Sequence, residues 1–244
     1  MIEQSKQLCA LERSTLVFAM KLEQLSVLIP SGGGHDVRDD SVRAMVKRES
    51  HLASACATLA PTLNNVAVII LARALLENLI TLLWVIDNPD NPENLRLEKL
   101  NQMRRAARKN MNQGLLRILK RPDGLDCTND FLNRPEFIKI AKRKSVEERA
   151  KESNFHDIYN VFYSFLSMEL HGYSIRDPEE PPSTVMCEDL QCIGAFLNCS
   201  ALIAESWLSF RKRPSNEELR EALGLSNKEV VPNPPLQPTG SAGV

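Results

Sequence analysis

Apolar residues recur at helical spacing along most of the chain, and no stretch shows the strict apolar and polar alternation that is typical of a strand. The first helix is predicted for Ile2 to Ile29, and a Gly-rich turn follows it. The second helix is predicted to begin at Asp39 or Asp40, either of which can cap it, and to end near Leu59. Pro61 interrupts the helical pattern after that point. The first quarter of the chain is therefore predicted to be helical.

The segment from Thr62 to Ile86 is apolar around nearly its whole circumference, yet it carries Arg73, Glu77 and Asn78 in its middle. A helix of this kind is either the centre of a helical bundle or a membrane span. Each charge near the middle of a span would cost about 2.5 to 3.5 kcal/mol on insertion scales. We therefore predict a central bundle helix that is the most buried segment of the chain.

The second half of the chain contains clear start and stop signals for further helices. Ser145 and Ser215 each stand three residues before a Glu, which is the spacing of a capping box. Gly172 and Gly224 follow apolar periodic segments, as helix-ending glycines do. The predicted helices run from about Glu93 to Lys120, Pro135 to Ile140, Ser145 onward, Asn154 to His171, Cys187 to Arg211 and Ser215 onward, with a loop from Pro122 to Asn133.

These elements predict an all-α fold, with one single-domain helical bundle over residues 1–226 and a disordered C-terminal tail over residues 227–244. The hydrophobic content of 43% in 244 residues is enough for a sizeable core. The final stretch, VPNPPLQPTGSAGV, has no charge and no periodicity. It resembles the ends of many integron gene-cassette proteins, which implies a gene on mobile DNA.

The N-terminal sequence MIEQSKQLCALERS lacks the basic region and apolar core of a secretory signal, so a cytoplasmic location without membrane association is expected. The six cysteines form no CxxC motif, and no His stands at a zinc-finger spacing from them. We expect reduced thiols, no metal site and no cofactor.

Charge is distributed unevenly although the net charge is only −1. Residues 96–151 contain 16 Lys and Arg against 7 Asp and Glu, and the rest of the chain is acidic. In the predicted helix from Glu93 to Lys120, Arg105 and Lys109 lie opposite the apolar face, and Arg104 and Arg108 lie at its border. These four cations are our candidate nucleic-acid-binding residues, because such a surface attracts phosphates without regard to sequence. A solvated helix surface is the alternative interpretation.

A polar stripe marks the predicted helix from Asn154 to His171. The stripe consists of His156, Asn160, Tyr163, Ser167 and His171. These side chains are suited to directed hydrogen bonds and proton transfer, whereas a face that is only solvated normally holds Lys, Glu or Arg. Arg73 and Glu77 share a face of the central helix at i, i+4 spacing, in the order that gives the weaker local support. The pair is therefore expected to have tertiary partners.

The motifs Arg73-x-x-x-Glu77 and Tyr163-x-x-x-Ser167-x-x-x-His171-Gly172 resemble a bacterial all-helical family of unknown function that is similar to the HEPN superfamily. The resemblance implies a helical bundle, often a homodimer, and kinship to proteins of toxin–antitoxin and phage-defence systems, many of which are RNases. Catalytic HEPN ribonucleases carry Arg, four to six residues and then His. In this sequence only Arg149 and His156 match that spacing, a match that chance alone predicts about once.

Three classes of function fit these features. In the first, an RNA-directed HEPN-like protein uses Arg73, held by Glu77, to steady phosphate charge, with Tyr163, Ser167 and His171 completing the catalytic set and His171 acting as general base. The partners would then be RNA and an unknown neutralising partner. In the second, the same cluster is a structural hydrogen-bond network of a non-catalytic interaction bundle. In the third, it serves a small-molecule enzyme.

Overall fold

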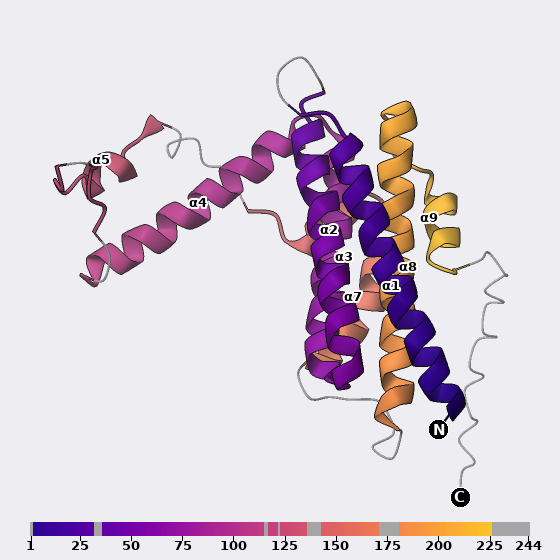
Figure 1. Ribbon diagram of the computed structural model, residues 1–244. Coiled ribbons are helices and arrows are strands. Elements are labelled where there is room, and N and C mark those ends of the chain that lie inside the picture. The colour runs from indigo at the N-terminus through magenta and orange to yellow at the C-terminus, as the bar shows by residue number, and fades with distance from the viewer. Residues whose placement is uncertain are drawn as a thin grey trace, which may run out of the picture.

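The computed structural model describes residues 2–31, 36–114, 117–121, 123–135, 143–170 and 181–225, and the regular elements in these ranges are helices (Figure 1). Within them the only pairing of extended backbone is an isolated bridge between Leu119 and Asp126. The predicted all-α class is confirmed. The predicted tail, residues 227–244, lies outside the described residues, as does nearly all of the predicted helix from Pro135 to Ile140.

Long helices pack side by side as the body of the molecule, with shorter helices against them (Figure 1). The long ones are α1 (Ile2–Leu28), α2 (Asp39–Leu59), α3 (Asn65–Asp87) and α8 (Pro182–Phe210). The shorter ones are α6 (Val146–Glu152), α7 (His156–Leu170) and α9 (Asn216–Ala222). Helix α3 contacts α2, α4, α6, α7 and α8, so it is the centre of the bundle, as its apolar circumference predicted.

The core position of α3 is clearest in its second half, where every residue from Asn78 to Ile86 is buried. The helix begins later than predicted, because Pro61 lies in a 3₁₀ turn, Ala60–Thr62, and Leu63 has a left-handed backbone with φ of 53°. Asn64 then caps it by accepting a hydrogen bond from the Ala67 amide. Helices α3 and α8 are both long and apolar enough to cross a membrane, but 61% and 50% of their most apolar windows are buried inside the bundle.

Helix α4 (Asn91–Asn112) leaves the bundle as an arm, with the short helix α5 (Thr128–Leu132) near its far end (Figure 1). The prediction of one helix as far as Lys120 is wrong, because the chain turns at Gly114, which has φ of 70°. The stretch predicted as a loop contains α5. Met103, a large apolar residue of α4, is 58% exposed, as expected for a helix that leaves the bundle.

The helix starts show which local signals were sufficient. The capping boxes at Ser145 and Ser215 are confirmed, because each Ser accepts from the N3 amide and each N3 Glu accepts from the Ser amide. The predicted Asp cap of α2 is wrong, since Arg38 occupies the N-cap position without a side-chain hydrogen bond. Asp39 is instead buried and accepts hydrogen bonds from Trp207 Nε1, at 2.8 Å, and from Arg211. A tertiary role has replaced the local one.

Candidate functional site

Arg73 and Glu77 form the predicted ion pair on α3, with 3.2 Å between Arg73 Nε and Glu77 Oε1. Their side chains are 26% and 38% exposed. Of the three polar residues in the middle of this apolar helix, only Asn78 is buried. The pair lies before the continuously buried half of α3, where one side of the helix still reaches solvent.

Tyr163 of α7 is the tertiary partner that the Arg73–Glu77 order predicted. An Arg73 Nη2 hydrogen donates to the Tyr163 hydroxyl, and the guanidinium carbon lies 4.5 Å from the ring centroid. Tyr159 stacks on Tyr163 with 4.6 Å between ring centroids. Burial, followed by the neighbouring Tyr163, raises the pKa of Tyr159 above its ordinary value. Arg73 is therefore held between a carboxylate and an aromatic stack while part of it stays accessible.

The polar stripe of α7 is only partly assembled around this pair. His156, at the start of the helix, lies 3.5 Å from Glu147 Oε1 through Nε2 and 3.4 Å from the Asn160 amide nitrogen through Nδ1. Ser167 is half-buried one turn beyond Tyr163. His171 lies outside the described residues, so its proximity to Arg73 stays a prediction.

Arg149 and His156, the one pair at the ribonuclease spacing, have separate partners. Arg149 donates to Glu98 of α4 and, at 3.2 Å, to Thr81 of α3. His156 pairs with Glu147 instead. The two side chains therefore bond to different parts of the fold and not to each other.

A cleft of about 440 Å³ opens between α2, α3, α4 and α6, and sequence reasoning missed it. Glu77 lines the cleft and also pairs with Arg73, so the cleft and the Arg73–Glu77 ion pair share this residue. Its charged lining residues are Asp40, Arg48, Glu77, Glu98, Lys99, Arg143, Lys144 and Arg149. One feature of the sequence could have pointed to the cleft. Glu98 is an acid in a mostly basic helix, and it lies on the same helix face as the apolar Leu95.

Ion pairs around Trp84 fix the α6 wall of the cleft. The Trp84 indole donates to Glu152 Oε2 at 2.6 Å, and Lys144 Nζ donates to the same carboxylate at 2.6 Å. The hydrogen bond from Lys144 is the main cause of a lowered pKa for Glu152. The charged groups of Lys144 and Arg149 lie 5.2 and 5.1 Å from the Trp84 ring centroid. The wall is thus tied to the core helix by several directed contacts.

Asn78, also in the cleft lining, reaches inward to a buried carboxyl group. Its amide donates to Glu49 Oε1 at 2.6 Å and to the Met45 carbonyl at 3.1 Å. Glu49 is fully buried, and burial raises its pKa to about 8, although the Asn78 bond and the Arg48 charge act in the opposite direction. This carboxyl group is therefore mostly neutral at pH 7.

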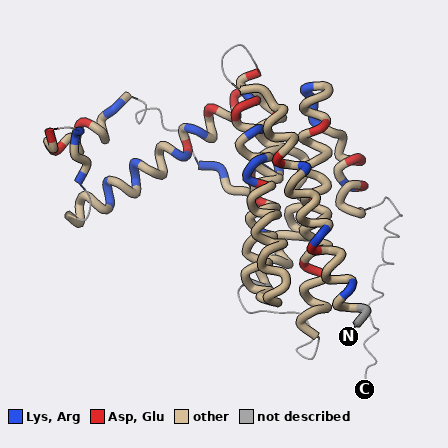
Figure 2. Tube along the Cα trace, viewed as in Figure 1, with Lys and Arg blue, Asp and Glu red and all other residues tan. Residues whose placement is uncertain are grey.

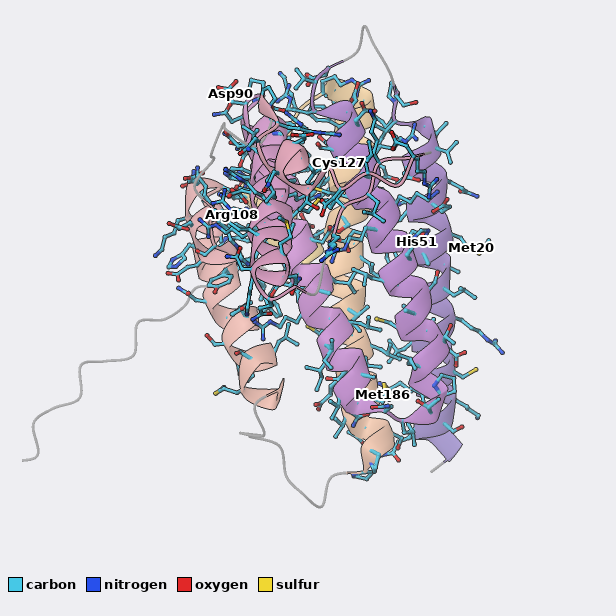
Figure 3. The ribbon with its side chains drawn as sticks, turned by 90° about the vertical axis from the view of Figure 1, so that its left-hand side faces the viewer. Met20, His51, Asp90, Arg108, Cys127 and Met186 are labelled. Carbon is cyan, nitrogen blue, oxygen red and sulfur yellow. The ribbon has the colours of Figure 1, made fainter. Side chains whose placement is uncertain are left out.

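The candidate nucleic-acid-binding residues lie on the α4 arm. Arg105, Arg108 and Lys109 are exposed and Arg104 is half-buried. Figure 2 shows the blue of Lys and Arg repeated along the arm, and in Figure 3, where the arm faces the viewer, Arg108 lies in front of the bundle. Between Lys99 and Arg121 the sequence has eight Lys and Arg and no Asp or Glu. The part of the arm that begins at Lys99 is therefore strongly basic.

No group of three or more His, Cys, Asp or Glu side chains suited to a metal ion occurs in the ranges that the structure describes.

Comparison with known families matches residues 43–177 to a family described as "Family of unknown function (DUF5677)". The match covers more than half of the chain, so the chain belongs to this family. No curated protein and no solved structure matches it. The predicted resemblance to a family of unknown function is confirmed, whereas kinship to the HEPN superfamily stays a prediction.

Proposed function

We propose that this member of DUF5677 is an HEPN-like RNA-binding protein that holds RNA along the α4 arm. The observation that carries the proposal is the run from Lys99 to Arg121, eight cations without an acid, of which five lie on α4, the helix that projects from the bundle, and three follow it. Each phosphate contact by such a cation releases a condensed counterion, which favours binding of any RNA sequence. The proposal places the protein among RNA-directed factors of defence or toxin–antitoxin systems on mobile DNA.

The arm differs from the surface of the bundle in how close together its unpaired cations stand. On the bundle several exposed cations pair with acids, as Lys21 does with Glu205 at 2.8 Å. Arg105, Arg108 and Lys109 form no ion pair with any residue in the described ranges. Three adjacent cations without acidic partners favour an external polyanion.

The Arg73 cluster is the candidate chemical site of the same protein. The supporting observation is that Glu77 and Tyr163 orient a guanidinium that is still 26% exposed. In the cleavage reaction His171 would take the proton of an RNA 2′-hydroxyl, and the 2′-oxygen would bond to the adjacent phosphorus as the bond from phosphorus to the 5′-oxygen breaks. Arg73 would stabilise charge on the phosphate, and the leaving 5′-oxygen would take a proton from water or from the protonated His171, without a metal ion. The competing function is an interaction bundle in which Arg73 only joins α3 to α7, and the two contacts of Arg73 support that role equally well.

The arm is tested by fluorescence anisotropy with a single-stranded RNA. The variant Arg105→Gln, Arg108→Gln, Lys109→Gln should bind at least about tenfold more weakly than the wild type, and its plot of log affinity against log salt should be shallower by about two. The matched control Lys6→Gln, Arg13→Gln, Arg43→Gln removes the same charge from exposed positions of α1 and α2 and should change affinity little. Equal binding by the two variants, or no RNA binding by the wild type, would contradict the proposal.

A further inference from the structure

The cleft between α2, α3, α4 and α6 lies where the arm joins the bundle, and its lining is suited to a ligand of its own. Its volume of about 440 Å³ lies in the range of small-molecule sites. It opens at the root of α4, and its lining combines charged groups with apolar ones such as Met45 and Leu95. Since four elements meet there, its shape depends on tertiary structure and no sequence motif marks it.

The ion pairs of the cleft leave a surplus of positive charge. Glu98 is paired with Arg149, Glu77 with Arg73, and Lys144 with Glu152. Among the described residues, no ion pair is formed by the remaining charged lining residues, which are Arg48, Lys99, Arg143 and Asp40. Three cations on three different segments therefore converge on one cavity with one unpaired acid.

Arg149, a lining residue of the cleft, has one donor that no described residue accepts from. Arg149 Nε is buried and has no acceptor among the described residues, although the Nη atoms of the same guanidinium bond to Thr81 and Glu98. Arg149 is 12% exposed and is locked in place by these bonds. A buried donor without an acceptor is costly, so such a group commonly marks a place where a ligand or water accepts its hydrogen bond.

We propose that this cleft binds a phosphate group, with Arg48, Lys99 and Arg143 as the cations that contact it and Arg149 at its inner wall. Guanidinium groups form paired charge-assisted hydrogen bonds with phosphate oxygens, which suits a site with two exposed Arg in its lining. The phosphate belongs either to a free small molecule, whose organic part meets Met45 and Leu95, or to RNA that passes from the arm. The chemistry is the same in both cases, and the site does not require the arm to bind RNA.

The experiment is calorimetric titration of the full-length protein with pyrophosphate, together with anisotropy on RNA that carries either a 5′-phosphate or a 5′-hydroxyl group. The variant Arg48→Gln, Arg143→Gln should weaken pyrophosphate binding at least about tenfold. The matched control Arg105→Gln, Arg108→Gln removes two Arg from the arm and should leave pyrophosphate binding unchanged. Arg48→Lys, Arg143→Lys should restore part of the affinity, and melting curves show that each variant is folded.

Two results support the site and identify the source of the phosphate. Saturable pyrophosphate binding that the cleft variant loses indicates a free ligand. RNA binding that the cleft variant weakens without saturable pyrophosphate binding indicates an RNA phosphate, which is terminal if only 5′-phosphorylated RNA is affected. The proposal is overturned if a folded cleft variant matches the wild type with every probe. Failure of the arm variant to change RNA affinity would refute the proposed function and leave the pyrophosphate result intact.

Discussion

Two buried glutamates beside α3 show two different ways to place a carboxyl group in a helical core. Glu98 of α4 is 2% exposed and meets a cation, Arg149. Glu49 of α2 is 0% exposed and meets the neutral amide of Asn78. A buried carboxylate is tolerated if it is paired, and otherwise its pKa rises until it is neutral. The structure contains one example of each, on two helices that both contact α3.

The two glutamates connect different parts of the structure. Glu98 accepts from the Lys144 backbone amide, at 3.1 Å, as well as from Arg149, so it connects the root of α4 to the segment that leads into α6. Glu49 lies in the interior between α2 and α3, where Asn78 also bonds to the Met45 carbonyl. The charged pair therefore organises the cleft, and the neutral pair fixes how two core helices pack.

Arg149→Ala should have the largest effect on stability. The substitution leaves the Glu98 charge buried without its cation, which costs about 3 to 5 kcal/mol in comparable buried pairs. We expect a marked drop in melting temperature and in the urea midpoint, measured at pH 7 by circular dichroism.

The control for this prediction removes both charges. Arg149→Met with Glu98→Leu should recover most of the lost stability, because apolar residues of similar size often replace a buried ion pair at little cost. If the double variant is as unstable as Arg149→Ala, the Arg149 contact with Trp84 rather than the ion pair is the main contribution.

Glu49 should make stability depend on pH in a direction opposite to that of an ordinary paired acid. Its pKa is about 8 in the folded protein against an ordinary 4.5. The folded state therefore keeps a proton that the unfolded chain releases above pH 4.5, and this stabilisation is lost as the pH rises toward 8. The slope can reach about 1.4 kcal/mol per pH unit, so urea unfolding should show a loss of about 2 kcal/mol between pH 6 and pH 8.

Glu49→Gln isolates this contribution, because Gln keeps the size of the side chain and an acceptor for Asn78. The difference in unfolding free energy between wild type and variant should change with pH over this window, with the variant gaining relative stability as the pH rises. Parallel pH profiles would mean that Glu49 is ionised throughout, and the distinction between the two glutamates would then disappear. The nearby Cys56 thiol stays protonated in the folded protein between pH 6 and pH 8, because burial raises its pKa to about 12.

Sequence patterns were sufficient where local chemistry decides the structure. The all-round apolarity of Thr62 to Ile86 identified the central helix, and the Ser145 and Ser215 boxes identified two helix starts. The i, i+4 order of Arg73 and Glu77 predicted a tertiary partner, and Tyr163 is that partner. Each of these signals depends on residues of a single helix or of its first turn.

Tertiary contacts decided the features that the sequence did not predict. Asp39 was available as a helix cap, but Trp207 and Arg211, far along the chain, bond to it instead. The cleft combines residues from α2 to α6, and no local pattern contains Glu98 together with Arg149. Periodicity also could not show that α4 leaves the bundle, because an apolar face on an arm looks the same as one on a core helix.

Arg73→Ala extends the comparison to a carboxyl group that is only partly buried. Glu77 is 38% exposed, so water can hydrate its charge after the cation is removed. The loss should be about 1 to 2 kcal/mol, from a partly exposed ion pair and one hydrogen bond to Tyr163, which is well below the loss for Arg149→Ala. Urea unfolding measures it, with Tyr163→Phe as the control that removes only the hydroxyl.

The same variant separates the two functions of the Arg73 cluster, because the fold should survive the substitution. If the cluster cleaves RNA, Arg73→Ala and His171→Ala should both remain folded and lose cleavage of a labelled RNA, whereas Tyr163→Phe should keep part of it. If the cluster only joins α3 to α7, the wild type is inert towards RNA and Arg73→Ala changes stability alone. If Arg73→Ala lowers the free energy of unfolding by more than about 3 kcal/mol, hydration of the partly exposed Glu77 does not compensate for the lost cation. The difference in burial between Glu77 and Glu98 would then not explain the large effect expected for Arg149→Ala.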